Sequence, residues 1–111
     1  VIETGAVTTL AGTAGLSGSA DGTGAAARFN FTFDITTDGT NLYVTHQDSH
    51  TIRKVVIETG AVTTLAGTAG LSGFTDGTGS AARFRSPMGI TTDGARLYIV
   101  DSNNNTIRTI Q

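Results

Sequence analysis

"VIETGAVTTLAGTAGLSG", residues 1–18, returns letter for letter at residues 56–73. A shift of 55 positions aligns residues 1–55 with residues 56–110, and 36 of the 55 aligned pairs are identical. A fixed period of this length is typical of architectures in which each repeat forms one supersecondary unit. The sequence therefore predicts two tandem repeats, 1–55 and 56–110, that share one fold.

Short alternating stretches separated by Asp-Gly and Thr-Gly pairs fill each repeat. Val, Ile, Thr and Tyr favour extended strands, and glycine accepts the positive φ that tight hairpin turns require. We therefore expect an all-β fold in which each repeat forms a four-stranded antiparallel meander. The expected strands are 33–37, 41–46, 51–58 and 61–66, then 88–92, 96–101 and 106–110, preceded by an alternating strand at 6–12.

Composition excludes several classes of function. The chain has 111 residues and a net charge of −2, and its seven Lys and Arg residues are scattered rather than gathered in a basic stripe. We therefore expect no nucleic-acid partner. The chain has no apolar run long enough to cross a bilayer, so we expect no membrane partner, and we recognise no signal-peptide pattern. The absence of cysteine excludes disulfides and thiolate metal sites but leaves the compartment open.

The stretch SPMGITTDGARLYIVDSNNNTIRTI (86–110) resembles the NHL repeat, whose blades read Pro-x-Gly-Ile, Asp-x-x-Gly, Leu-Tyr-Val-x-Asp and Asn-x-x-Ile-Arg. The stretch VTTLAGTAGLSG (7–18), followed by DGTG (21–24), is similar to the long glycine-rich insert of the bacterial version of this repeat. The resemblance covers nearly the whole chain. It implies a β-propeller with two blades in this chain, each a four-stranded antiparallel meander.

The first repeat departs from the NHL pattern, because residues 32–34 (Thr-Phe-Asp) stand where the second repeat has Pro-Met-Gly, and His46 stands where it has Asp101. NHL propellers are mostly binding and scaffolding domains, so the resemblance implies a non-enzymatic module. Two alternatives stay open. One is a metal-assisted lyase or lactonase, as in some propeller relatives, and the other is a fragment or an engineered repeat without an evolved ligand.

Meander geometry places the long glycine-rich loop and the turns at 47–50 and 102–105 at one end of the fold. Fourteen of the 19 positions that differ between the repeats lie at this end, and loops on a rigid sheet often carry binding sites. The differences indicate either drift of loops or two different half-sites. We predict here a binding face for a protein, peptide or glycan. It comprises Asp34, His46, Gln47, Asp48, His50, Arg85, Asp101, Asn103 and Asn104.

The two histidines are the candidates for metal chemistry. His46 and His50 flank a turn that contains Asp48, and imidazole together with carboxylate can hold a divalent metal. We interpret these side chains as solvated or turn-stabilising, and we expect no metal site, no cofactor and no catalytic residue. Arg53 and Arg108 are expected to be structural donors to the Asp-rich turns.

Asp34 has two possible placements. Its carboxylate could point into the central channel of a ring together with its symmetry mates, where like charges would raise each other's pKa or recruit a cation. It could instead turn aside to Arg28 or Arg83. The sequence leaves the two open.

Two blades cannot close a ring, and the repeat is permuted so that the last strand of the closing blade, 6–12, stands first. We expect a neighbouring chain to donate 6–12 to the incomplete sheet formed by 88–110. The expected partner is thus the chain itself. Because propellers of this kind usually have six blades, we expect a homotrimer, with an eight-bladed tetramer as the second possibility.

Overall fold

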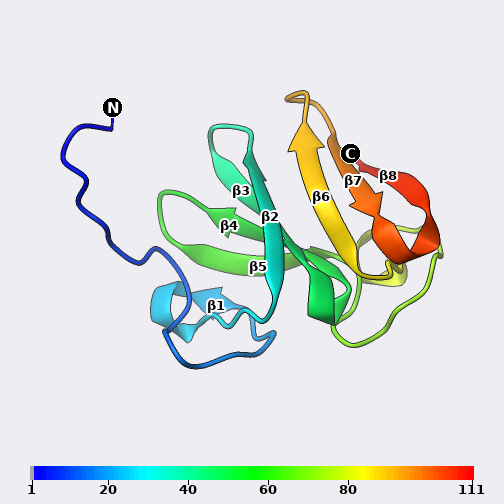
Figure 1. Cartoon of the computed structure of the whole chain (residues 1–111), viewed down its shortest axis with the longest axis horizontal. Coiled ribbons are helices and arrows are strands. Elements are labelled where there is room, and N and C mark those ends of the chain that lie inside the picture. Colours follow the sequence, from blue (N-terminus) through cyan, green and yellow to red (C-terminus); the bar gives the residue numbers. More distant parts are fainter. Residues whose placement is uncertain (1) are drawn as a thin grey trace.

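The computed structural model describes residues 2–111, which form two antiparallel sheets. The first sheet has five strands in the order β1-β5-β4-β3-β2, and the second has three in the order β6-β7-β8. Figure 1 shows the two sheets next to each other. The strands are Gly22–Thr23 (β1), Thr32–Thr37 (β2), Asn41–His46 (β3), Thr51–Val56 (β4), Ala61–Ala66 (β5), Pro87–Thr92 (β6), Leu97–Asp101 (β7) and Thr106–Ile110 (β8).

Two kinds of connection join the strands. At one end, the β2–β3 and β6–β7 hairpins turn at Gly39 and Gly94, both with φ of 93°, which a residue with a Cβ rarely adopts. At the other end, single turns of 3-10 helix join β3 to β4 and β7 to β8. These two turns are Gln47–Ser49 (η2) and Ser102–Asn104 (η4), and two further 3-10 turns, Gly24–Ala26 (η1) and Gly79–Ala81 (η3), lie in the loops before β2 and β6. In the described chain, no helix is long and apolar enough to cross a membrane.

The all-β meander predicted from the sequence is confirmed. Strands β3, β5 and β8 have the predicted bounds, and β2, β6 and β7 differ from them by one residue. The strand predicted at 51–58 stops at Val56, because the Gly60 N–H bonds the Val56 carbonyl at 2.8 Å and closes a turn over 57–59.

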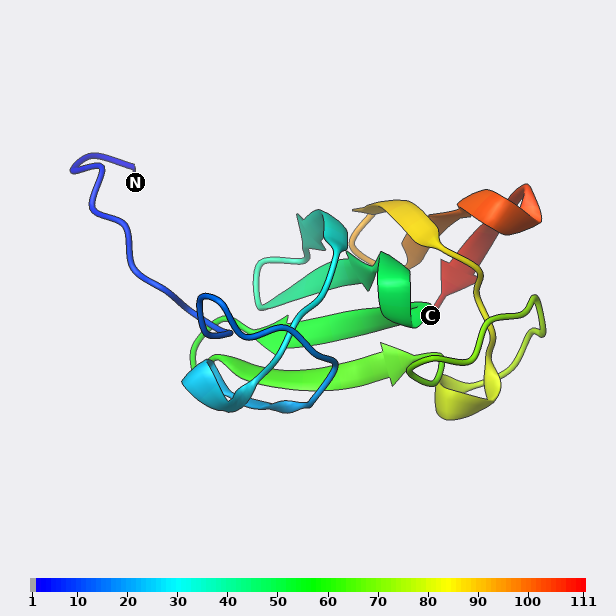
Figure 2. The same cartoon turned by 60° about the horizontal axis from the view of Figure 1, so that its bottom comes forward.

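The strand predicted at 6–12 is absent from the structure. The backbone of this segment pairs with no strand among residues 2–111, and residues 2–10 are exposed. Figures 1 and 2 show this segment, the N-terminal arm (residues 2–10), leaving the body at the end away from β8. The sequence predicts that this segment pairs with a neighbouring chain, and within one chain it has no strand beside it, so its strand conformation stays a prediction.

The core lies mainly between the two sheets. Ile52 of the first sheet packs with Phe84, Ile90 and Ile99, and all four are less than 8% exposed. Burying side chains of this size stabilises the fold by about 1.5–3 kcal/mol each. A second, smaller cluster lies on the opposite face of the first sheet. It consists of Ala27, Val55 and Val62, with Ala11, Phe29 and Leu42 packed against it.

Candidate functional site

A buried carboxylate holds the loop end of the second sheet together. Asp101, at the end of β7, is 0% exposed. Its Oδ1 accepts the Arg85 N–H at 2.8 Å, and its Oδ2 accepts from Arg108 Nη1 and Asn104 Nδ2, both at 2.8 Å. One side chain therefore ties together the loop that precedes β6, the turn after β7 and strand β8. Charge-assisted bonds of this kind are shorter and stronger than neutral ones.

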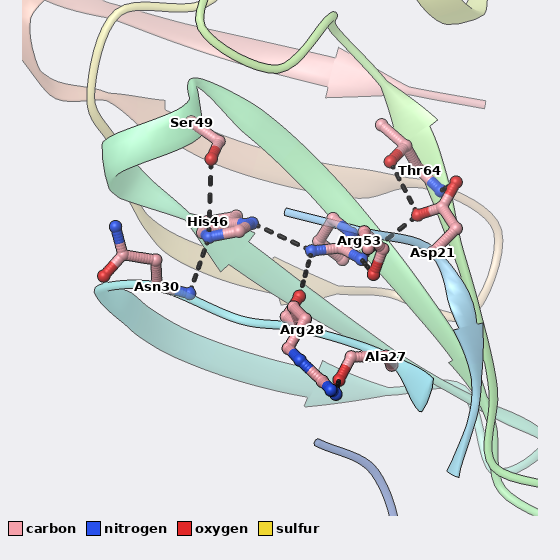
Figure 3. Close-up of polar contacts among 9 residues, drawn as sticks. Asp21, Ala27, Arg28, Asn30, His46, Ser49, Arg53 and Thr64 are labelled. Carbon is pink, nitrogen blue, oxygen red and sulfur yellow. Dashed lines mark hydrogen bonds and ion pairs between the residues drawn. The ribbon is translucent and has the colours of Figure 1, made fainter. Parts of the chain in front are cut away.

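His46 takes the same place in the first sheet, as Figure 3 shows. It is also 0% exposed. Its Nε2 accepts the Asn30 N–H at 2.8 Å, and its Nδ1 lies 3.0 Å from Arg53 Nη1. Both ring nitrogens thus face N–H donors, although a neutral imidazole can accept at only one of them. His46 therefore occupies the position of Asp101, but it cannot accept from both donors as the carboxylate does.

The surroundings of His46 disfavour its protonated form. Burial is the main cause, and the Arg53 guanidinium adds to it, so the pKa of His46 falls from 6.5 to about 4. Asn30 and Asp48 act in the opposite direction but do not offset these effects. At neutral pH the ring is therefore uncharged.

The arginine of each repeat is the second half of this arrangement. Arg53 Nη1 and Nη2 donate to the carbonyls of Arg28 and Ala20, both at 3.0 Å, and Nη2 donates to Asp21 Oδ1 at 3.1 Å. Its guanidinium lies 5.1 Å from the centre of the Phe29 ring, within range of a cation–π interaction. The structural role expected for the arginine is confirmed, and the glycine-rich loop is fixed rather than free.

The second repeat copies this geometry. Arg108 donates to the carbonyls of Arg83 and Thr75 at 2.8 and 3.1 Å and pairs with Asp76 at 2.8 Å. Its guanidinium lies 5.0 Å from the centre of the Phe84 ring. The loop ends of both sheets are therefore rigid platforms built to one plan.

Three residues of the predicted binding face belong to these platforms. His46 and Asp101 are buried, and Asn104 bonds both the Gly73 carbonyl at 2.7 Å and Asp101. Placing His46 and Asp101 on an accessible face was wrong, because each satisfies donors from loops that cover it. The burial of His46 and Asp101 could have been predicted from their spacing to the arginine of the same repeat. In the hairpin register, Arg53 and Arg108 lie two residues beyond the partners of these side chains, on the same side of the sheet.

Five predicted residues line the accessible part of the loop end. Gln47 and His50 are half-buried, whereas Asp48, Arg85 and Asn103 are exposed. Asp48 Oδ2 accepts from Asn30 Nδ2 at 3.0 Å, and Asn103 Nδ2 donates to Ser86 Oγ at 3.3 Å. We call the surface formed by Asn30, Phe31, Gln47, Asp48, His50, Arg85, Ser86 and Asn103 the loop face.

A bond between the sheets makes the loop face continuous. His50 Nδ1 accepts the Ser86 N–H at 3.0 Å, and the Gln47 N–H donates to the Phe31 carbonyl at 3.2 Å. The acidic half around Asp48 therefore stands beside the basic half around Arg85. The two repeats present different chemistry on the same scaffold.

The Asp34 carboxylate does not turn aside to Arg28 or Arg83, and its placement in the channel of a ring stays a prediction. Its Oδ1 accepts the N–H of Ile35 at 2.8 Å, and its Oδ2 accepts the N–H of Ile90 in β6 at 3.1 Å. The alternative partners Arg28 and Arg83 donate instead to carbonyls of their own loops. A break in the β2–β3 register between residues 32 and 35 accompanies this geometry, since bulges re-aim side chains. Asp34 thus links the two sheets.

Three residues of the loop face, Asn30, Phe31 and Ser86, were not predicted from the sequence, and Phe31 is the aromatic one. Its side chain is 73% exposed, and its backbone has φ of 49°, the left-handed region that bulky residues avoid. The aligned residue Ser86 has φ of 51°. Strained backbone is found often at functional sites. The available signal was an aromatic residue replacing Ser at a loop position.

Metal binding finds no support in the side-chain positions. Among residues 2–111, no group of three or more His, Cys, Asp or Glu side chains is placed to hold an ion. His46 and His50, the two histidines weighed for this role, each use a ring nitrogen to accept a backbone N–H.

Comparison with known proteins supports the propeller-like fold. No protein-family model matches the chain. Over 70 residues, 62% of the chain, it is 41% identical to the protein SUPPRESSOR OF QUENCHING 1, chloroplastic, of Arabidopsis thaliana, and it covers 6% of that protein.

Solved structures from Bacteroides thetaiotaomicron match almost the whole chain. An auxiliary nutrient binding protein matches with a TM-score of 0.79 and 29% identity, over 91% of this chain and 27% of its own. A protein of unknown function matches with a TM-score of 0.83 and 29% identity, over 90% of this chain and 26% of its own. A third protein, which carries a provisional phosphatase name, matches with a TM-score of 0.80 and 28% identity, over 93% of this chain and 26% of its own. The chain has an all-β fold of propeller-like blades and spans about a quarter of these neighbours.

Proposed function

We propose that this chain is a non-enzymatic binding and scaffold module of the NHL type, which takes a peptide or glycan on the loop face. One observation carries the proposal: Phe31 is held exposed with a positive φ on the loop face, which also carries the exposed side chains of Asp48 and Arg85. An exposed aromatic ring with amide, carboxylate and guanidinium groups beside it suits a polar ligand with apolar faces. The nutrient-binding names of two solved neighbours agree with a binding role.

The binding proposal has a matched pair of arginines for its test. Arg85 lies on the loop face and Arg96 lies at the opposite end of the same sheet, and both are exposed. The probes are a panel of neutral and acidic oligosaccharides and a panel of short peptides, screened by amide chemical shifts. We expect a binding probe to shift residues 30–34, 46–50 and 85–86. Arg85→Ala should weaken that probe about tenfold, and Arg96→Ala should leave it unchanged.

Phe31→Ser gives the second half of this test, because Ser is the residue at the aligned position 86. It should weaken the same probe and should not lower stability, since Phe31 is exposed and Ser86 adopts the same positive φ. Equal loss in Arg85→Ala and Arg96→Ala, or shifts confined to the hairpin turns at Gly39 and Gly94, would refute the loop face as the binding site.

We also propose that copies of this chain join head to tail into a ring of six blades, with each chain supplying a strand to the next. Each sheet is one blade, so three chains give six. The proposal rests on the second sheet, which has three strands where the corresponding part of the first has four. Light scattering should give about three times the chain mass of 11.3 kDa. Four times that mass would indicate the eight-bladed ring, and a stable monomer would exclude both.

A further inference from the structure

A groove runs along the outer edge of β8. It has a volume of about 1040 Å³, and its walls include Asp76, Gly77 and Thr78 on one side and Arg108 and Ile110 on the other. Among residues 2–111, β8 is an edge strand, so its outer backbone groups face this groove. Unpaired edges of this kind are templates for a further strand.

The same place in the first sheet is filled. There β5 lies between β4 and β1, pairing Val62 with Val55 on one side and with Gly22 on the other. Residues 77–78 and β8 repeat the sequence positions of β1 and β4, so the groove is the space that a second β5 would occupy. Asp21 holds β5 in this place, because it accepts from Thr64 N at 3.3 Å and from Thr64 Oγ1 at 3.0 Å. The aligned Asp76 side chain is 96% exposed, against 48% for Asp21.

The chain carries a second segment with the sequence of β5. Residues 6–11 are identical to residues 61–66, yet Val7 is 94% exposed whereas Val62 is 2% exposed. The root of the arm is fixed as the end of β5 is: the Gly12 N–H bonds the Gly24 carbonyl at 3.0 Å, and the Gly67 N–H bonds the Gly79 carbonyl at 3.1 Å. The arm therefore lies where the last strand of a preceding sheet would lie.

We propose that the groove is a strand-docking site and that its occupant is residues 6–11 of a second copy. This inference rests on the ring assembly proposed above and adds its contacts and register. By alignment with the first sheet, Val7 of the second copy pairs with Ile110 and Gly77, and its Thr9 pairs with Arg108. Thr9 gives Asp76 the donors that Thr64 gives Asp21.

Two exposed apolar surfaces fit the same arrangement. Between the sheets of one chain, Ile52 packs with Ile90, and the Thr45 hydroxyl donates to the Met88 carbonyl at 2.6 Å. The aligned residues on the outer face of the second sheet are Ile107 and Val100, 66% and 45% exposed, and those on the outer face of the first sheet are Ile35 and Phe33, 55% and 57% exposed. A copy that donates its arm also brings Phe33 and Ile35 against Val100 and Ile107.

Cysteine trapping tests the register directly, because the chain has no cysteine of its own. Thr8 and Thr109 align with Thr63 and Lys54, which are paired in the first sheet. The double variant Thr8→Cys, Thr109→Cys should form disulfide-linked multiples of the chain on oxidation, since Cα atoms of paired residues lie within disulfide range. Thr8→Cys, Thr106→Cys, three residues out of register, should not. Equal cross-linking of both pairs, or none of either, would overturn the proposed register.

A second pair of variants separates this inference from the ring itself. Val7→Lys places a charge at the position that is buried in β5, whereas Thr8→Lys places it at the position of the exposed Thr63. Light scattering should give monomeric Val7→Lys and assembled Thr8→Lys. If both variants assemble like the wild type, the head-to-tail ring stands, but the strand-docking site and the supply of a strand by each chain are refuted. If the wild type is a monomer, both proposals fail.

Discussion

Replacing Asp101 by alanine is expected to lower the free energy of unfolding by about 3–5 kcal/mol, because the change leaves the charge of Arg108 without its buried partner. The Asp101 carboxylate is wholly buried, and three N–H donors converge on it within 2.8 Å. Its loss frees the loop before β6 and the turn after β7 at the same time. A domain stabilised by only 5–15 kcal/mol retains little after such a loss.

Asp93→Ala is the matched control for Asp101→Ala. Asp93 also accepts three bonds, from the N–H groups of Ala95 and Arg96 and from the Tyr98 hydroxyl, and these lower its pKa. It is exposed, however, so water replaces the lost partners. Urea unfolding followed by circular dichroism should give a far larger loss for Asp101→Ala than for Asp93→Ala. Equal losses would show that the buried carboxylate does not hold the loop end together.

The sequence predicted the antiparallel meander but not which segments have a neighbouring strand to pair with. Alternation and glycine turns were enough to place β3 and β5, because hairpin geometry is local. Whether a segment becomes a strand depends on an edge beside it, which local sequence cannot encode. Residues 6–11 and 61–66 have identical sequences, yet Val7 is exposed and Val62 is buried.

The candidate site was predictable only in its location. The end of the fold that carries the variable loops was inferred from topology, but His46 and Asp101 were placed on its accessible face. His46 and Asp101 are instead buried, and each accepts a backbone N–H from the loop beside it, that of Asn30 or of Arg85. Phe31 was overlooked because its exposure follows from a positive φ that the sequence does not reveal for a non-glycine residue.

His46 should make the first sheet sensitive to acid. Burial and then the Arg53 guanidinium lower the pKa of His46 to about 4, whereas in the unfolded chain it is near 6.5. Between pH 6.5 and pH 4 the unfolded state therefore binds a proton at His46 that the folded state does not bind. Stability is unaffected above pH 7 and is lost as the pH falls from 6.5 toward 4. The expected loss between pH 7.5 and pH 5 is about 2 kcal/mol.

The measurement is urea unfolding from pH 7.5 to pH 5 in a His50→Asn background, which leaves His46 as the one titrating imidazole. Asn is the residue at the aligned position 105, where it adopts φ of 57° against 60° for His50. Adding His46→Asp should abolish most of the pH dependence. It should also raise stability at pH 7.5, because a carboxylate accepts from both the Asn30 N–H and Arg53, where a neutral imidazole accepts one.

The second sheet supplies the precedent for this gain, since Asp101 accepts from Arg85 and Arg108 in the geometry that His46 imitates. The reverse exchange, Asp101→His, should therefore introduce the same acid sensitivity into the second sheet, with a smaller cost at neutral pH than Asp101→Ala. If His46→Asp is less stable than its parent at pH 7.5, the Asn30 N–H and the Arg53 guanidinium do not lack an acceptor beside His46. If the pH dependence survives the exchange, a group other than His46 carries it.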